Sequence, residues 1–395
     1  GTSNTAFWGN GTSTNVNLWH NGTSFLNSGS VLVASNYYVA SARFGAGAIT
    51  NIINVNGEET ASNTTNDNTT LHTDASPVQI GGYDGTSPLD GKIAEAIVYD
   101  KALTNAEIDL VESYLAIKYG FTLDQTYVAS GTTIWDATIN ASYNNDIFGV
   151  GQDNASALDQ KVSKSINANA IITIANNNDF ASANNDPGRT SLGNGNFAVI
   201  GNNSGTATWT ATGAPIGYEV LSKQWKIDET GTVGSLYIQF DLADADFDVP
   251  VPASQVGTDY YIIADTDNDQ DLSDETPILL SASGNLWSVA VDFAEGAIFA
   301  LASASQLLAA AYSLRDVGTP GDNAIRVRRS SDNSLQDIGF DANGDLDLVA
   351  LTGFVGPGND GFVTTWYDQS GNGLHVTAQA AAQEPKIVSA GAVVM

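Results

Sequence analysis

An acidic loop at residues 265–275 carries the side chains best suited to bind a metal ion. Its sequence is Asp-Thr-Asp-Asn-Asp-Gln-Asp-Leu-Ser-Asp-Glu, which places carboxylates at loop positions one, three, five and seven. Alternate side chains of a tight loop converge on one point, and oxygen ligands in this pattern are typical of Ca²⁺ sites. The pattern predicts a structural calcium ion held by the side chains of Asp265, Asp267 and Asp269 and by the carbonyl or carboxylate of Asp271. Either Glu275 or Asp274 would close the ligand shell.

The same loop departs from the EF-hand pattern at two positions. Gln270 stands where that motif has its glycine, and Thr276 occupies the twelfth position. The alternative is a solvated acidic turn, although like charges this close destabilise a fold unless a cation neutralises them. A second acidic turn, at 341–347, has ligand spacing only in part and also fits an ordinary hairpin.

Catalytic residues are not evident in the sequence. The chain has no cysteine, which excludes thiolate catalysis and cysteine zinc sites. Three histidines, at His20, His72 and His375, lie far apart without the spacing of metal ligands. We therefore expect a protein that is not an enzyme.

The charge of the chain narrows the range of partners. The formal net charge is −30 at pH 7, and so acidic a chain repels nucleic acid and anionic membrane surfaces. The sequence contains no long apolar run, so we expect no membrane insertion. A cysteine-free chain stabilised by metal ions is compatible with a secreted protein at a bacterial surface.

Residues 1–123 have the pattern of a β-rich part that closes with one helix. Thr104 and Glu107 have the spacing of a capping box, and Gly120 supplies a stop signal, so a helix is expected between them. Strands are predicted at 31–33, 37–42, 52–58 with an Asn-Gly turn, 78–82 and 91–99.

The strand order of residues 1–122 and their closing strand-plus-helix motif, Gly91–Glu95 followed by Glu112–Gly120, resemble a known family. They look like the C-terminal half of a concanavalin A-like (laminin-G-type) jelly roll, with the opening strands of that family missing upstream. The resemblance implies a lectin-like sandwich. Stacking faces for sugars would come from Trp8, Trp19, Tyr37, Tyr38 and Tyr83, although aromatic residues in sandwiches are usually core.

Residues 124–303 read as a second antiparallel sandwich. Many short alternating segments are separated by turn residues, including 171–174, 197–201, 224–227, 236–240 and 260–264. The pattern resembles a domain that follows lectin-like modules in large secreted proteins of Bacteroidota-type bacteria. The fold class predicted for the chain is all-β, with antiparallel jelly-roll or Ig-like sandwiches and one or two short helices.

Residues 304–395 form the third predicted part. A helix is expected at 306–315, and strands at 324–329 and 361–367. The Tyr-Asp-Gln-Ser-Gly-Asn-Gly run at 367–373 and its neighbours are similar to the opening of the α-L-arabinofuranosidase B module, itself a concanavalin A-like sandwich. No catalytic residue carries over, because the match stops before the body of that module.

Two groups in this third part have plain structural interpretations. We read Trp366 as a core aromatic and Asp368 as a carboxylate that caps a turn. The basic residues Arg315, Arg326, Arg328 and Arg329 either pair locally with Asp332 and Asp337 or dock on an acidic neighbouring subunit.

Together these features predict a structural or adhesive subunit of an extracellular, cell-surface bacterial protein. Residues 304–395 of one copy would complete the lectin-like sandwich of the next copy, and such head-to-tail pairing generates a filament. Alternatively, the chain is a fragment of a longer multi-domain adhesin. The second functional class is a carbohydrate-binding module with glycan partners, and the third is a glycoside hydrolase remnant.

Overall fold

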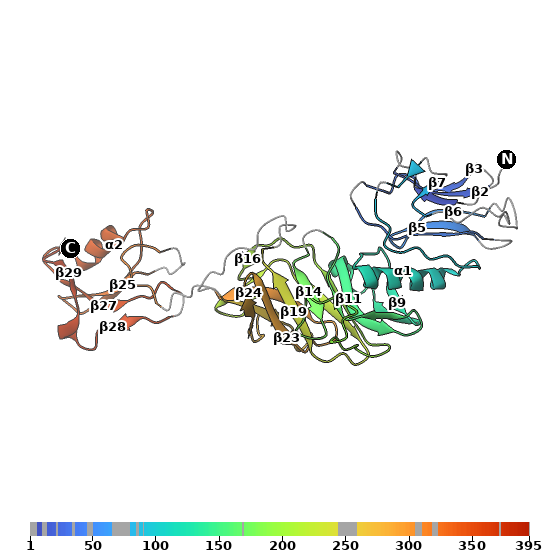
Figure 1. The fold of residues 1–395 in the computed structure, drawn as a ribbon. Coiled ribbons are helices and arrows are strands. Elements are labelled where there is room, and N and C mark those ends of the chain that lie inside the picture. The colour runs from blue at the N-terminus through green and yellow to red at the C-terminus, as the bar shows by residue number, and fades with distance from the viewer. Residues whose placement is uncertain are drawn as a thin grey trace. The chain divides into compact units, whose positions relative to one another are not determined.

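The structure is a computed structural model. It divides into two compact units, residues 1–305 and 306–395 (Figure 1). The described residues are 6–9, 14–20, 23–33, 36–45, 50–64, 80–83, 87–89, 91–167, 170–243, 259–304, 310–317, 323–370 and 373–394.

Two small antiparallel sheets face each other near the start of the chain. One contains β1 (Ala6–Gly9), β2 (Val16–His20) and β3 (Thr23–Asn27), and the other contains β4 (Ala40–Arg43), β5 (Asn51–Val55) and β6 (Glu58–Asn63). Val16 and Leu18 of β2 share a buried core with Ile53 and Val55 of β5. A short ladder of β7 (Gly82–Tyr83) and β8 (Ser87–Pro88) follows.

The turn between β5 and β6 confirms the Asn-Gly prediction. Asn56 and Gly57 both have positive φ, 52° and 87°, as a tight hairpin turn requires. The strand predicted at 37–42 begins at Ala40, and residues 31–33 are not a strand. Of the strand predicted at 78–82, residues 78 and 79 lie outside the described residues.

The strand predicted at 91–99 does not form among the described residues. Residues 92–99 belong to no β-ladder of the described residues. Alternation of apolar and polar residues predicts an extended backbone, but a ladder also needs a partner strand, which periodicity does not supply.

Helix α1 (Asn105–Tyr119) confirms the predicted caps. Thr104 Oγ1 accepts from the backbone N–H of Glu107, and Glu107 Oε2 accepts from the backbone N–H of Thr104, which completes the capping box. Gly120 ends the helix in the left-handed conformation, with its N–H bonded to the carbonyl of Ala116.

After α1 comes a hairpin and then a β-sandwich (Figure 1). The hairpin contains β9 (Tyr127–Ala129) and β10 (Thr132–Trp135), and a short 3₁₀ turn covers Ala141–Tyr143. Its Tyr127 and Trp135 are buried with Ala116 and Ile117 of α1. The helix is therefore fixed to this second domain by an apolar core.

Two antiparallel sheets form the sandwich, as the sequence predicts for 124–303. The larger sheet contains β11 (Asn145–Asp153), β12 (Leu158–Gln160), β15 (Phe197–Asn202), β16 (Trp209–Thr210), β17 (Tyr218–Leu221), β18 (Trp225–Thr230), β20 (Tyr260–Ala264), β21 (Ile278–Leu279) and β24 (Ile298–Ala304). The smaller contains β13 (Val162–Ser163), β14 (Ile172–Ala175), β19 (Leu236–Asp241), β22 (Ser281–Ser283) and β23 (Leu286–Val291).

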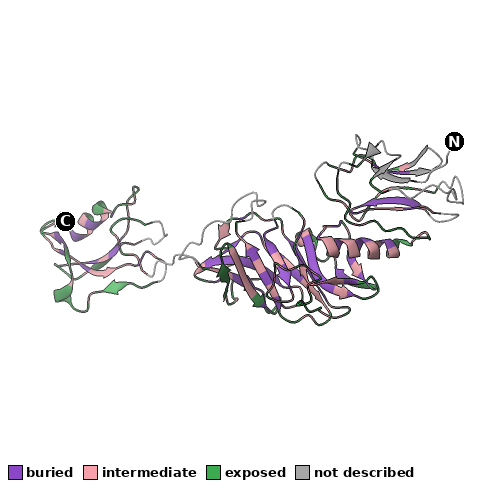
Figure 2. Ribbon diagram, in the orientation of Figure 1, coloured by how far each residue is buried: buried purple, intermediate pink, exposed green. Residues whose placement is uncertain are grey.

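The core of the sandwich lies between these sheets. Trp225 of β18 stacks on Phe299 of β24 and meets Phe240 of β19 edge to face. The central strands are buried along most of their length (Figure 2). Alternating burial along β19, in the pattern of a half-covered strand, confirms the sequence reading of this segment.

Residues 306–395 have their own sheet and core. The strands are β25 (Ile325–Arg329), β26 (Leu335–Ile338), β27 (Gly361–Trp366), β28 (Val376–Thr377), β29 (Lys386–Ser389) and β30 (Ala392–Val393), and a 3₁₀ turn covers Ala381–Gln383. Helix α2 (Leu348–Val355) buries Leu351 and Val355 in the core that includes Ile325 and Val327 of β25.

The helix predicted at 306–315 is wrong where the structure describes it. Residues 310–315 are not helical, and Arg315 forms an isolated antiparallel bridge with Asp345. Residues 305–309 lie outside the described residues. Helix α2 was not predicted, because its run of apolar residues with an internal glycine lacks the polar face that marks a surface helix.

Gly120 gives a test of how closely α1 is tied to the second domain. A Cβ on Gly120 would lie 2.3 Å from the carbonyl oxygen of Lys164, at a φ of +70°. Gly131 also has a positive φ, +81°, but nothing lies within 4 Å of its added Cβ. We expect Gly131→Ala to lower the free energy of unfolding by about 1–2 kcal/mol and Gly120→Ala to cost more, because the second also meets backbone.

Denaturant unfolding of both variants measures this difference. Equal losses would show that the carbonyl of Lys164 moves away freely, and that the contact after α1 is not rigid.

Candidate metal centre and candidate pairing edge

The acidic loop begins directly after β20, where the strand leaves the larger sheet of the second domain. The backbone N–H of Asp265 still bonds to the carbonyl of Ile298 on β24. Leu272, in the middle of the loop, is buried with Ile263 and Ile298. These contacts hold both the start and the middle of the loop against the sandwich.

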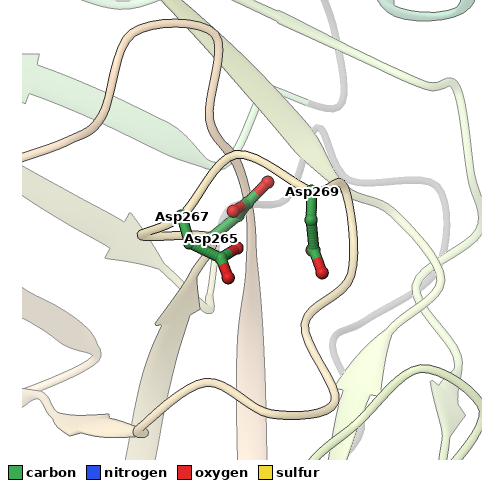
Figure 3. A group of neighbouring side chains, drawn as sticks. All are labelled: Asp265, Asp267 and Asp269. Carbon is green, nitrogen blue, oxygen red and sulfur yellow. The ribbon is translucent and has the colours of Figure 1, made fainter.

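Three of the five predicted ligands come together (Figure 3). Asp265, Asp267 and Asp269 each offer a carboxylate oxygen, and these oxygens lie within 4.8 Å of one another. Asp265 is buried, with 1% of its surface exposed, whereas the other two are exposed. Its oxygens accept from the backbone N–H groups of Asn268 and Gln270, which fixes the carboxylate inside the loop.

Two predicted ligands are turned toward other groups. Asp271 accepts from the backbone and hydroxyl of Ser273. Glu275 accepts from the backbone and hydroxyl of Thr266. The calcium site as a whole stays a prediction, with the three convergent carboxylates as its nucleus.

The departure from the EF-hand at the sixth position is accommodated by the backbone. Gln270 has a φ of +68° and Asn268 a φ of +63°, the left-handed region in which glycine is ordinarily preferred. The Gln270 side-chain amide donates to Asp265 and Asn268. The loop therefore curves without its glycine.

Charge repulsion is visible at Asp267. Burial and then the neighbouring carboxylates of Asp269, Asp274 and Asp265 raise the pKa of Asp267 above its ordinary value. The hydrogen bonds from Ser273 lower the pKa of Asp271. A divalent cation among the three convergent carboxylates would reverse the repulsion at Asp267.

A second candidate site is the segment 92–99, which we name the pairing edge. Ile93, Ile97, Val98 and Tyr99 on this segment are exposed, Val98 to 87%. In the part of the chain that the structure describes, residues 92–99 belong to no β-ladder, and Ala94 accepts a hydrogen bond from the hydroxyl of Tyr119. A strand edge without a partner is a template for another strand.

The pairing edge is held to α1 through Glu95. Its carboxylate accepts from Lys118 Nζ at 2.8 Å, from the hydroxyl of Tyr119 at 3.0 Å and from the hydroxyl of Tyr114 at 3.1 Å. Burial opposes ionisation of Glu95, but these bonds lower its pKa below the ordinary value. Sequence reasoning missed this anchor, although the spacing of Tyr114 and Lys118 places them on one helix face.

The basic residues of the C-terminal unit pair locally. Arg326 makes two bonds to Asp337, of 2.6 and 2.8 Å, and Arg329 makes two to Asp332. Arg328 bonds to Glu384, and Arg315 lies 3.7 Å from Asp345. Local pairing, rather than docking on a neighbouring subunit, therefore describes these arginines. The group presents little unpaired positive charge.

Asp368 is a capping carboxylate, as predicted. It accepts from the backbone N–H groups of Ala311, Ser370 and Leu374 and from the hydroxyl of Ser370. Burial opposes its ionisation, but these bonds lower its pKa far below the ordinary value. His375 accepts from the backbone N–H of Asp368, so it too has a structural role.

Trp366 and the turn at 341–347 have structural roles, as a core aromatic and as an ordinary hairpin. Trp366 packs on the core of the C-terminal unit. Asp341 accepts from the backbone of Asn343 and Asp345, as in a hairpin, and Asp347 caps α2.

The candidate sugar-stacking residues are only partly described. Tyr37 is exposed and meets Phe121 edge to face, with ring centroids 6.3 Å apart. Tyr38 is half-buried against the core of the first two sheets. The side chains of Trp8, Trp19 and Tyr83 lie outside the described residues.

One acidic pair in the second domain was not predicted from the sequence. Burial, followed by repulsion from Glu295 and Asp292, raises the pKa of Glu229 to about 7. The backbone N–H of Glu229 donates to Glu295, while its own Oε1 is buried without a partner. The two carboxyls lie 66 positions apart in sequence, so only the fold brings them together.

Comparison with family models gives two matches. Residues 2–109 match the concanavalin A-like lectin/glucanases superfamily. The match supports a concanavalin A-like fold for this part, which we call the lectin-like part. Residues 107–297 match a domain of unknown function (DUF8202), so the two matches meet within α1. Neither the curated proteins nor the solved structures give a match to the chain.

The match of residues 2–109 agrees with the sheets of residues 6–63 and with the all-β class of the chain. The superfamily includes glucanases as well as lectins by its name, so the match alone assigns no activity. Helices long and apolar enough to cross a membrane do not occur in the described part of the chain.

Substitution of Asp267 tests the metal centre. In EDTA, we expect Asp267→Asn to keep or slightly raise stability, because it removes repulsion. At a calcium concentration 100 times the dissociation constant, the wild type should gain about 2.7 kcal/mol, and the variant should gain much less. Thermal unfolding with and without calcium measures both effects.

The control is Asp186→Asn, which removes one charge from another loop of the same domain, where Asp186 accepts from the backbone N–H of Gly188. It should respond to calcium as the wild type does. A wild type whose unfolding temperature ignores calcium would contradict the metal centre.

Proposed function

We propose that this protein is a structural and adhesive subunit at the outside of a bacterial cell. In this proposal the lectin-like part of one copy pairs with residues 304–395 of the next copy, and repetition builds a head-to-tail filament. The protein acts without catalysis.

The observation that carries the proposal is the pairing edge. Residues 92–99 lie outside every β-ladder of the described chain, and the apolar side chains of Ile93, Ile97, Val98 and Tyr99 on them are exposed. Addition of a strand from another chain would satisfy such a backbone and cover its apolar side chains. Glu95 already fixes the segment to α1, so a partner strand would not have to order it.

The C-terminal unit supplies strands that could donate. Leu335 lies on β26, an edge strand of its sheet, and Val376 lies on the short strand β28; both side chains are exposed. Because the pairing edge and this unit are different surfaces of one chain, contact between them in neighbouring copies is heterologous and does not close by itself.

Calcium would have a structural role in this subunit. The convergent Asp265, Asp267 and Asp269 lie on a loop fixed to the second domain, with Leu272 as its buried anchor. Neutralisation of these carboxylates would stabilise that domain in an extracellular medium rich in calcium. A chain without cysteine has no disulfides for this purpose.

Carbohydrate recognition is the second candidate function. The lectin-like match of residues 2–109 and the exposed ring of Tyr37 favour it. Binding on a glycan array that is lost in Tyr37→Ala would support this candidate, and an array without any binding would remove it.

Substitution on the pairing edge tests the filament. Val98 is 87% exposed, so Val98→Asp should leave the fold intact. If Val98 is covered by the next copy, burying the new charge should weaken association by about 100-fold or more. Sedimentation velocity over a concentration series measures this change.

The matched control is Ile216→Asp, at a side chain of the second domain that is 93% exposed. It should associate as the wild type does. A wild type that stays monomeric at every concentration, or equal association of both variants, would contradict the proposal.

A further inference from the structure

Glu112 is a buried acid at the boundary between the lectin-like part and the second domain. It lies on α1, where the two family matches meet, and none of its surface is exposed. Its Oε1 accepts from the hydroxyl of Ser41 on β4 and, at 3.2 Å, from Nδ2 of Asn54 on β5. The carboxyl thereby joins α1 to the sheet of the lectin-like part.

The same two groups leave two acceptors unpaired. Glu112 Oε2 and Asn54 Oδ1 are both buried, and neither has a hydrogen-bond partner. A buried oxygen without a partner destabilises the fold, and more so if it is charged. Two acceptors on adjoining groups cannot satisfy each other unless a proton stands between them.

Charges around the carboxyl do not favour its ionised form. Asp109, one turn earlier on α1, adds repulsion. Arg43 on β4 directs its guanidinium to Asn105 and to backbone carbonyls instead of to Glu112. On the second-domain side of the helix, Asp153 is held by Ser130 and Ser156. A buried carboxylate without a cation is strongly destabilising.

We propose that Glu112 is protonated in the folded protein at neutral pH and donates from Oε2 to Oδ1 of Asn54. With the existing bond from Asn54 Nδ2 to Glu112 Oε1, this makes a reciprocal pair of hydrogen bonds between α1 and β5. One proton satisfies both unpaired acceptors. The joint between the lectin-like part and the second domain is then a proton-dependent latch.

The direction of the pH dependence follows from the environment. Burial, which outweighs the bonds from Ser41 and Asn54, raises the pKa of Glu112 above its ordinary value of 4.5. The stabilisation is therefore complete below that ordinary value and is lost as the pH rises through the pKa of the folded state. Alkaline conditions would weaken the latch.

Glu112→Gln tests the latch, because the amide of glutamine has the donor and the acceptor of the protonated acid. We expect the variant to unfold at the same temperature as the wild type near pH 5. Its unfolding temperature should fall less than that of the wild type as the pH rises from about 5 to about 9. This outcome does not depend on filament assembly.

The control is Glu107→Gln on the same helix. Glu107 is only half-buried, and its bonds to Lys101 and Thr104 lower its pKa to about 2. Its contribution is present at neutral pH and is lost only in acid, so this variant should keep the alkaline pH dependence of the wild type. Parallel pH profiles of Glu112→Gln and the wild type, or a Gln variant less stable at neutral pH, would overturn the proposal.

A spectroscopic measurement covers the case in which Glu112→Gln does not fold. Burial also raises the pKa of Glu229 and Glu295, so both are changed to glutamine in protein labelled with ¹³C-glutamate. Its infrared spectrum at neutral pH should then retain the C=O stretch of one protonated glutamate. Absence of that band would overturn the proposal.

Discussion

Helix α1 is the element on which the arrangement of residues 1–305 depends. Its Ala116 and Ile117 are buried against the hairpin of the second domain, and its Glu112 bonds to the sheet of the lectin-like part. Lys118, with two neighbouring tyrosines, holds the pairing edge through Glu95. A helix of this length is marginal in isolation, so the caps and these contacts stabilise one another. One fifteen-residue helix thus holds both the pairing edge and the sheet of the lectin-like part.

The pairing edge has the apolar side chains of a β-strand but belongs to no ladder of the described residues. This explains why a lectin-like part would act in an assembly. The pairing edge is fixed by the ion pair of Glu95 with Lys118 and exposes apolar side chains. Water satisfies the backbone groups of a free edge, but apolar exposure favours association. Association through such an edge requires little ordering of the segment, because Glu95 already fixes it to α1.

The sequence predicted the features that depend on local chemistry. The capping box at Thr104, the Asn-Gly turn at 56–57 and the alternation in β19 each arise from neighbouring residues, and all three are confirmed. Pairing depends on distant segments, so the absence of a ladder between 92–99 and the other described residues could not be read from the alternation of this segment. The Ala-rich run at 306–315 had helix propensity, but the bridge of Arg315 to Asp345 holds its end in extended form. The types and spacing of its residues predicted the acidic loop. Asp271 and Glu275, however, accept hydrogen bonds from neighbouring hydroxyls, and this depends on the local path of the backbone.

Electron microscopy of the intact protein, with and without EDTA, tests most directly the claim that one copy completes the next. The account predicts regular fibres whose axial repeat corresponds to one subunit, and shorter or fewer fibres once calcium is removed. Isolated particles in both conditions, even at high protein concentration, would contradict assembly through the pairing edge.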